Sequence, residues 1–402
     1  MQWIREKRKM RDKALILSAP YIIASENSSK LCCDITCSDR SFTAWFEVTS
    51  EYSRYLTADR LDAFAVVFLP LAMRENADMI CKAPVSPELI YQINHYLTPV
   101  LGKNIKEYNA ITLNAKPAGE RIQSEGAAGT GWTGGVDSMY TLKTRLKASE
   151  PHMRLTHLVI ANIGTLESSD NEGLLDIMVK RAEAGICADT GLKCVGINSN
   201  LDTVLPENYL AVAGYRLPAA VLALQGLFSV FYHSGAYEFD TFTFAGENSA
   251  YYEMFLLPCL STDATVFYSS GSSISRIEKL KELSDYPYAE QYLHPCIYAK
   301  TGKNCGKCGK CIRTIAALYA LGTLDRFDKV FDTSDFYNNK DHYLANVISN
   351  RHRQHYKESY DMMTEKGLIT VKSMQLSKMQ NAAKIIADRN RSTLEKVLGK
   401  EK

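Results

Sequence analysis

The sequence of 402 residues lacks both a long hydrophobic run and an excess of charge of either sign. No uninterrupted apolar stretch approaches the roughly 18 to 20 residues that cross a bilayer, so we exclude a membrane-spanning protein. The 47 basic and 45 acidic residues leave a formal net charge of only +2. This balance argues against a polybasic nucleic-acid coat. Any charged partner must be recognised locally, and we do not expect direct binding of nucleic acid.

The cysteine content excludes one class of protein as well. The 11 cysteines are too few for a disulfide scaffold in a chain of this length, and their number is odd. The basic stretch 5–13 followed by the apolar run 14–24 mimics a secretory signal, but Pro20 interrupts the run and no small-x-small cleavage site follows. We therefore expect a cytoplasmic protein. We find no internal repeat, and the length suits two or three domains.

The N-terminal part reads as a small α+β domain, which we place at residues 1–117. Stretches rich in β-branched and aromatic residues, separated by Ser/Asn and Ser/Asp turn signals, predict an antiparallel meander. Two helical patterns and one further strand follow. The expected strands are 14–25, 30–37, 41–48 and 108–114, and the expected helices are 61–75 and 86–100.

The rest of the chain alternates strand and helix patterns after a connector rich in Gly, Ala and Ser at 116–131. This alternation predicts an α/β domain at 128–325, with a parallel sheet and helices on its faces. Charges at helical spacing predict a helical C-terminal segment at 326–402. The expected strands are 156–162, 193–198 and 241–245, and the expected helices are 173–190 and 217–233.

The first chemical signal is the glycine loop, residues 131–138, with the sequence Gly-Trp-Thr-Gly-Gly-Val-Asp-Ser. It opens a predicted helix at 139–146. Adjacent glycines let the backbone approach a ligand closely, and a helix N-terminus offers unpaired N–H groups, so the loop predicts an anion site. It is neither a Walker loop nor a dinucleotide fingerprint. The alternative is a Gly-Gly turn capped by Asp or Ser.

The loop resembles the signature Ser-Gly-Gly-x-Asp-Ser of the PP-loop ATP pyrophosphatases, which follows the first strand of a Rossmann-like domain. Thr133 stands in place of the first Ser, and no strand is obvious in 120–130. The resemblance implies that Thr133, Gly134, Gly135 and Ser138 hold the β and γ phosphates of ATP. It implies that Asp137 orients Mg²⁺ and pyrophosphate, with Asp137 and Ser138 in catalytic roles.

The second signal is a cysteine cluster, Cys296-x8-Cys305-x2-Cys308-x2-Cys311. Four thiolates at short spacings match a tetrahedral Zn²⁺ site, and a closed site of this kind is structural. An iron–sulfur cluster uses the same ligand atoms, and reactive or disulfide-forming cysteines are a further alternative. Nearby basic residues, Lys310 and Arg313 among them, would offset the charge of a zinc tetrathiolate.

Taken together, the two motifs resemble the 7-cyano-7-deazaguanine synthase family over residues 129–322, near half of the chain. The additional domains are similar to larger relatives, some of them found in antiviral operons. The resemblance implies ATP, Mg²⁺ and Zn²⁺ as cofactors. It further implies a deazapurine or a protein as the substrate and an operon-encoded protein as a partner. A homodimer is compatible with it.

Three other residues are candidates for the nucleotide site. The resemblance implies that Gly246, in a loop expected after strand 241–245, lies beside the substrate, and that Arg276, next to a serine, has a catalytic role clamping phosphate. The alternatives are a simple strand-ending turn at Gly246 and a solvated helix face at Arg276. Asn162 ends a predicted strand and is placed to touch nucleotide, although a strand-end Asn is also a common turn residue. Lys279 lies one helical turn beyond Arg276, and we expect it on a solvated helix face.

The expected activity is an ATP-dependent ligase or synthase. It adenylates a carbonyl or carboxylate oxygen, releases pyrophosphate, and replaces AMP with a nitrogen nucleophile. A sulfur-inserting PP-loop enzyme and a non-catalytic nucleotide-binding assembly module are the alternatives.

Overall fold

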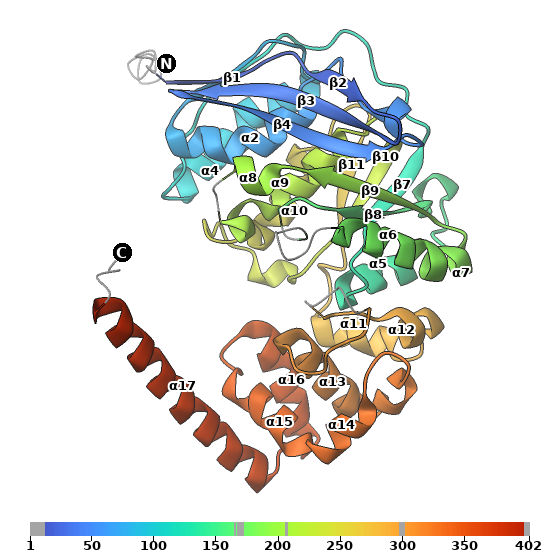
Figure 1. The fold of residues 1–402 in the computed structure, drawn as a ribbon, viewed down its shortest axis with the longest axis vertical. Coiled ribbons are helices and arrows are strands. Elements are labelled where there is room, and N and C mark those ends of the chain that lie inside the picture. The colour runs from blue at the N-terminus through green and yellow to red at the C-terminus, as the bar shows by residue number, and fades with distance from the viewer. Residues whose placement is uncertain (1–12, 165, 167–172, 206–207, 297–301, 398–402) are drawn as a thin grey trace. The chain divides into compact units, whose positions relative to one another are not determined.

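The computed structural model describes residues 13–164, 166, 173–205, 208–296 and 302–397. Contacts divide the chain into two compact units, and each is described by itself. The first unit comprises Met1–Thr133 and Tyr140–Ser273, and the second comprises Gly134–Met139 and Ile274–Lys402. Figure 1 shows the elements along the chain.

The first unit is built on a single sheet of eleven strands, joined mostly by parallel pairings. The strands are β1 (Ala14–Leu17), β2 (Tyr21–Ala24), β3 (Ser28–Cys37), β4 (Arg40–Thr49), β5 (Asp78–Cys81), β6 (Leu113–Asn114), β7 (Ala127–Gly131), β8 (His157–Ala161), β9 (Lys193–Ser199), β10 (Phe228–Ser234) and β11 (Val266–Ser270). Their order across the sheet is β11-β10-β7-β8-β9-β4-β3-β1-β5-β6, and β2 pairs with β3.

Strands β7 to β11 form a parallel half that is typical of doubly wound α/β sheets. Across the sheet they lie in the order β9-β8-β7-β10-β11, so the first of them in the chain is central. The order therefore reverses at β7, between β8 and β10. Ligands of such sheets bind outside the carboxyl ends of the strands at this reversal. The coarse fold class predicted from the sequence, α/β with a parallel sheet, is confirmed.

The N-terminal strands do not form a separate sheet, because β4 pairs antiparallel with β9 through Phe46↔Ser199 and Glu47↔Asn198. One sheet thus contains the strands that precede the connector at 116–131 and the strands that follow it. The contact-based division consequently differs from the three segments 1–117, 128–325 and 326–402 expected from the sequence.

Helices of the first unit cover the sheet and bury the apolar faces of their sequences. The buried helix α2 packs on α9, and both contribute to one hydrophobic core. These helices are α2 (Asp62–Glu75), α3 (Pro87–Gln92), α4 (Thr98–Asn104), α6 (Leu174–Ala182), α7 (Ala188–Thr190), α8 (Leu201–Val204), α9 (Tyr209–Leu222) and α10 (Glu253–Cys259). Helix α5 (Val136–Arg145) begins in the second unit and continues in the first.

Short 3₁₀ and π segments complete the first unit. The 3₁₀ segments are η1 (Ser53–Tyr55), η3 (Pro151–Met153), η6 (Phe239–Thr241) and η7 (Ser249–Tyr252), and the π segments are η2 (Ile93–Leu97) and η5 (Glu183–Cys187).

The second unit is helical in its described part, as the C-terminal charge pattern predicts. Its elements are α11 (Arg276–Leu283), α12 (Pro287–Tyr292), α13 (Gly309–Leu321), η9 (Leu324–Phe327), α14 (Thr333–Asn338), α15 (Lys340–Ser349), α16 (Gln354–Glu365) and α17 (Val371–Val397). Helices α13, α15 and α16 pack together around Ala316, Leu344 and Met363. Within the described residues, no helix combines the length and the apolar character needed to span a bilayer.

Four sequence-based assignments were wrong. Of the expected strand 108–114, only Leu113–Asn114 is a strand. The stretch 217–233, expected to be one long helix, contains the end of α9 and then strand β10, because a continuously apolar run suits a buried strand as well as a helix. Residues 241–245 form no strand, and η6 ends there instead. Strand β7 lies directly before the glycine loop, where none was obvious.

Candidate functional site

The glycine loop follows the central strand of the parallel half. Strand β7 ends at Gly131, and the backbone N–H of buried Trp132 then donates to the carbonyl of Val159 at 2.8 Å, which continues the pairing toward β8. Thr133 is the last residue of this stretch in the first unit. The loop therefore departs from the carboxyl end of the strand at which the order of the sheet reverses, the position where ligands bind.

Gly134 turns the chain sharply into helix α5. Its φ is +70°, a left-handed conformation that favours glycine. A Cβ at this position would lie 3.1 Å from Cβ of His294, and the carbonyl of Gly134 accepts a hydrogen bond from the N–H of His294 at 2.7 Å. The loop is thus held against the chain just before Cys296.

Gly135 directly precedes α5, and Ser138 lies in the first turn of this helix. The carbonyl of Gly135 accepts from the N–H of Met139 at 2.9 Å and from Ser138 Oγ at 3.1 Å. The first N–H groups of a helix have no partner within it and carry the positive end of its dipole. This turn is therefore suited to binding an anion.

Asp137 lies in the same turn between two cations of α11. Its Oδ2 is 3.0 Å from Nη1 of Arg276, and its Oδ1 is 3.2 Å from Nζ of Lys279. Burial alone would raise the pKa of Asp137, but the charges of Arg276 and Lys279 outweigh it and hold the pKa below its usual value. The carboxylate is therefore ionised, with both oxygens paired to these cations. The structure thus brings the predicted residues Asp137 and Arg276 together.

Lys279 is not on a solvated helix face, as the sequence analysis expected, but is buried. Helix α11 begins with a capping box, in which Ser275 Oγ accepts from the N–H of Glu278 and Glu278 Oε2 accepts from the N–H of Ser275. This start places Arg276 and Lys279 three residues apart on one face of the helix. The Ser-x-x-Glu pattern, which predicts a helix start at Ser275, was the sequence signal that could have indicated that Arg276 and Lys279 share one helix face.

Further basic residues lie around this ion pair. Burial, together with the charges of Arg276 and Arg313, lowers the pKa of His355 to about 3, so the ring is neutral at pH 7. Desolvation and the same two arginines lower the pKa of Lys310. Arg276 is 9% exposed, and its Nε is buried without a hydrogen-bond partner among the described residues. This part of the second unit is suited to binding a phosphate group.

Asn162 and Gly246 have local contacts within the first unit. Asn162 follows β8 and is buried, its Nδ2 donating to Oδ1 of Asn198 at 2.8 Å. Gly246 does not follow a strand, since 241–245 is not one. A Cβ on Gly246 would lie 2.7 Å from Oε2 of Glu107 and 3.0 Å from Cγ2 of Ile105, so Gly246 packs beside the segment that follows α4.

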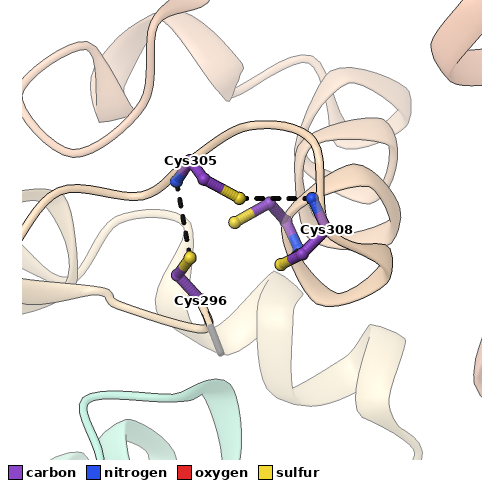
Figure 2. A group of neighbouring side chains, drawn as sticks. Cys296, Cys305 and Cys308 are labelled. Atoms are coloured by element: carbon purple, nitrogen blue, oxygen red, sulfur yellow. Dashed lines mark hydrogen bonds between the residues drawn. The ribbon is translucent and has the colours of Figure 1, made fainter. Parts of the chain in front are cut away.

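The four cysteines come together as the spacing predicts, and Figure 2 shows three of them, Cys296, Cys305 and Cys308. The sulfur atoms of Cys296, Cys305, Cys308 and Cys311 all lie within 4.8 Å of one another. Three backbone N–H groups point at them, from Cys305 to Cys296 Sγ at 3.5 Å, from Cys308 to Cys305 Sγ at 3.2 Å and from Cys311 to Cys308 Sγ at 3.4 Å. Such N–H···S contacts support metal-binding thiolates.

A residue that the sequence analysis did not single out, Asn304, ties the cluster to its surroundings. Its Nδ2 donates to the carbonyls of Leu293 at 2.9 Å and Val330 at 2.8 Å, and its Oδ1 accepts from the N–H of Cys296 at 3.3 Å. The cluster therefore has four soft ligands and an ordered outer shell. These features fit Zn²⁺, which four cysteines would enclose without leaving a position for water.

Comparison with protein-family models finds no match, and neither the curated proteins nor the solved structures include a significant match to this chain.

Proposed function

We propose that the protein is an ATP-dependent ligase that adenylates its substrate and releases pyrophosphate. The observation that carries this proposal is the position of the glycine loop, which leaves the central strand β7 at the reversal of the sheet and enters α5. In the first turn of that helix, Asp137 is paired with Arg276 and Lys279. A nucleotide triphosphate is a ligand that suits this combination.

In the proposed reaction, the N–H groups around Gly134 and Gly135 and the hydroxyl groups of Thr133 and Ser138 bind the β and γ phosphates. Mg²⁺ bound at Asp137 would neutralise phosphate charge. A carbonyl or carboxylate oxygen of the substrate attacks the α phosphorus, and pyrophosphate leaves with the bonding electrons. Arg276 and Lys279 stabilise the charge that develops on it, a contribution that requires no protein nucleophile.

Adenylation gives the substrate a good leaving group. A nitrogen nucleophile then displaces AMP, forming an amide or, after a second round, a nitrile. The resemblance of the two motifs to the 7-cyano-7-deazaguanine synthase family supports a deazapurine or a protein partner as the substrate, and ATP, Mg²⁺ and Zn²⁺ as cofactors. In this proposal the cysteine cluster is structural, and we place the protein in the cytoplasm.

The proposal is tested by identifying the nucleotide product. The purified protein is incubated with ATP, Mg²⁺, ammonium and a deproteinised bacterial extract as the source of substrate. We expect AMP and pyrophosphate, and we expect Asp137→Asn to abolish their formation, whereas Asp176→Asn, at an exposed position of α6, should retain it. ADP and phosphate as products, or no turnover, would contradict the proposal.

The same assay separates the alternatives. Incorporation of ¹⁵N from ammonium indicates nitrogen transfer, and incorporation of sulfur from sulfide indicates a sulfur-inserting enzyme. Binding of ATP without formation of AMP indicates a nucleotide-binding module.

A further inference from the structure

The ion pair at the start of α5 engages both oxygens of Asp137 with groups that would also bind a phosphate. Its Oδ2 is 3.0 Å from Nη1 of Arg276, and its Oδ1 is 3.2 Å from Nζ of Lys279. The carboxylate lies in the first turn of α5, where the unpaired N–H groups and the helix dipole attract an anion. All three residues belong to the second unit. Asp137 thus makes the contacts of a bound phosphate, with two oxygens on two cations at a helix start.

The two cations are closed to a ligand as long as Asp137 is paired with them. The side chain of Arg276 is 9% exposed and that of Lys279 is 2% exposed, whereas that of Asp137 is 19% exposed. Helix α11 is fixed at its start, where the N–H of Ile277 donates to Oε2 of Glu358 in α16 at 3.2 Å. The carboxylate is therefore the part of the pair that a ligand can reach and displace.

The surroundings of the pair carry more positive charge than Asp137 balances. Desolvation, and then the charges of Arg276 and Arg313, lower the pKa of Lys310, so these cations are close enough to repel one another. Arg276 also has a further donor, since its Nε is buried and forms no hydrogen bond among the described residues. A ligand with several negative charges would relieve this repulsion.

Neither half of a complex between a divalent cation and a polyphosphate can take this site without leaving a charge unpaired. A polyphosphate alone would displace the Asp137 carboxylate from both cations and place it beside phosphate oxygens of the same sign. A divalent cation alone would take the carboxylate and leave Arg276 and Lys279 buried without a counter-ion. Each of these states is costly, because a buried charge without a partner keeps its desolvation penalty. When both bind together, every charge retains an opposite partner.

We propose that the pairing of Asp137 with Arg276 and Lys279 is an ionic lock that excludes free polyphosphate and opens only for a polyphosphate that carries a divalent cation. This inference rests on the proposed function and specifies the form in which the nucleotide binds. Phosphate oxygens replace the carboxylate on the two cations, and the carboxylate turns to the divalent cation. No covalent bond changes in this exchange. The divalent cation and the polyphosphate consequently raise each other's affinity by the same factor.

The test measures binding of inorganic tripolyphosphate to the full-length chain by calorimetry, in buffer freed of divalent cations. Asp137→Asn keeps the shape of the side chain and removes the charge that holds the two cations. We expect this variant to bind tripolyphosphate roughly 10-fold more tightly than the wild type, because no carboxylate has to be displaced. Asp328→Asn, which removes the same charge from an exposed position of the same unit, is the matched control and should bind as the wild type does.

Added Mg²⁺ should favour the wild type. We expect the affinity of the wild type for tripolyphosphate to rise roughly 10-fold or more, whereas that of Asp137→Asn should rise much less because the variant lacks the carboxylate. The rise in the wild type is measured on the unaltered chain, so this part of the test does not depend on the folding of a variant.

Two results would overturn the ionic lock while leaving the proposed function intact. One is a wild type that binds tripolyphosphate no better with Mg²⁺ than without it. The other is a folded Asp137→Asn variant that binds the metal-free ligand no more tightly than the wild type, because the carboxylate would then be no obstacle. A wild-type chain that forms no AMP and pyrophosphate from ATP would contradict the proposed function itself, whatever the binding measurements give.

Discussion

Two cations of helix α11 keep Asp137 ionised, and only one of the two was identified as a site residue from the sequence. Arg276 begins α11 and was a candidate from the sequence, whereas Lys279 looked like an ordinary surface lysine. The side chain of Lys279 is 2% exposed, and its Nζ lies 3.2 Å from Oδ1 of Asp137. A buried charge without its partner is costly, so the pair has a measurable effect on stability.

We expect Lys279→Met to raise the pKa of Asp137 and to lower the free energy of unfolding by about 2 kcal/mol, less than for an isolated buried pair because Arg276 remains. Chemical denaturation of the full-length chain measures this change. Lys281→Met, at an exposed position of the same helix, is the matched control. An equal effect of the two substitutions would contradict the assignment of a buried ion pair.

His157 makes stability depend on pH. Burial, and then the charge of Lys193, lowers its pKa to about 4. Between pH 6.5 and about pH 4 the unfolded chain binds a proton at this histidine that the folded chain does not, so stability falls as the pH falls through this window. From pH 7 to pH 5 we expect a loss of about 2 kcal/mol from this residue.

The measurement for His157 is denaturant unfolding at both pH values. His157→Gln should remove this part of the pH dependence, while exposed His152→Gln should leave it unchanged. A His157→Gln chain with the full wild-type slope would show that the ring is protonated in the folded state.

At the scale of elements, strand β7 explains why the sequence hid the start of the glycine loop. Its sequence Ala-Ala-Gly-Thr-Gly has almost none of the β-branched and aromatic residues that mark strands. The rings of Phe228 and Phe231 on β10 occupy the space beside it, and a Cβ on Gly129 would lie 2.6 Å from the ring of Phe228. Small residues are thus required by packing, which no local pattern reveals.

Gly129→Ala should therefore destabilise the first unit by about 1 to 3 kcal/mol through overpacking against Phe228. Gly119→Ala is the control, since nothing lies within 4 Å of a Cβ there. Thermal unfolding of the two variants compares them directly. Equal stability would mean that β7 and β10 separate easily.

The elements that could be predicted from the sequence are those that local sequence patterns determine. The helical pattern at 86–100 predicted α3 and α4, the cysteine spacing predicted the cluster, and runs of β-branched residues predicted β3, β4, β8 and β9. The boundary between α9 and β10 could not be found, because both are buried and apolar throughout. The contact between His233 and Glu253 was also not predicted, because the two residues lie 20 positions apart in the sequence and come together only in the folded sheet.

At the scale of the whole molecule, two structural devices stand out, the continuous sheet of the first unit and the cysteine cluster of the second. The sheet depends on the pairing of β4 with β9, where Asn200 adds side-chain hydrogen bonds to the backbone of Thr43 and Trp45. These contacts join segments more than 150 residues apart, which the sequence does not indicate.

The cluster should hold one Zn²⁺ per chain. We expect Cys308→Ser to lose the metal, as measured by elemental analysis, and to lower the unfolding temperature of the second unit, because structural zinc contributes directly to folding. Cys259→Ser, which lies outside the cluster, should keep the metal. Full zinc occupancy in Cys308→Ser, or iron and sulfide in the wild type, would contradict the assignment.

The central claim, that the glycine loop binds a triphosphate, is tested most directly by a crystal structure of the protein with Mg²⁺ and a non-hydrolysable ATP analogue. We predict the β and γ phosphates within hydrogen-bonding distance of the backbone N–H groups of Gly134 and Gly135, with the α phosphorus accessible to a substrate oxygen. An analogue bound elsewhere, or a loop that Trp132 keeps closed to the nucleotide, would contradict the account.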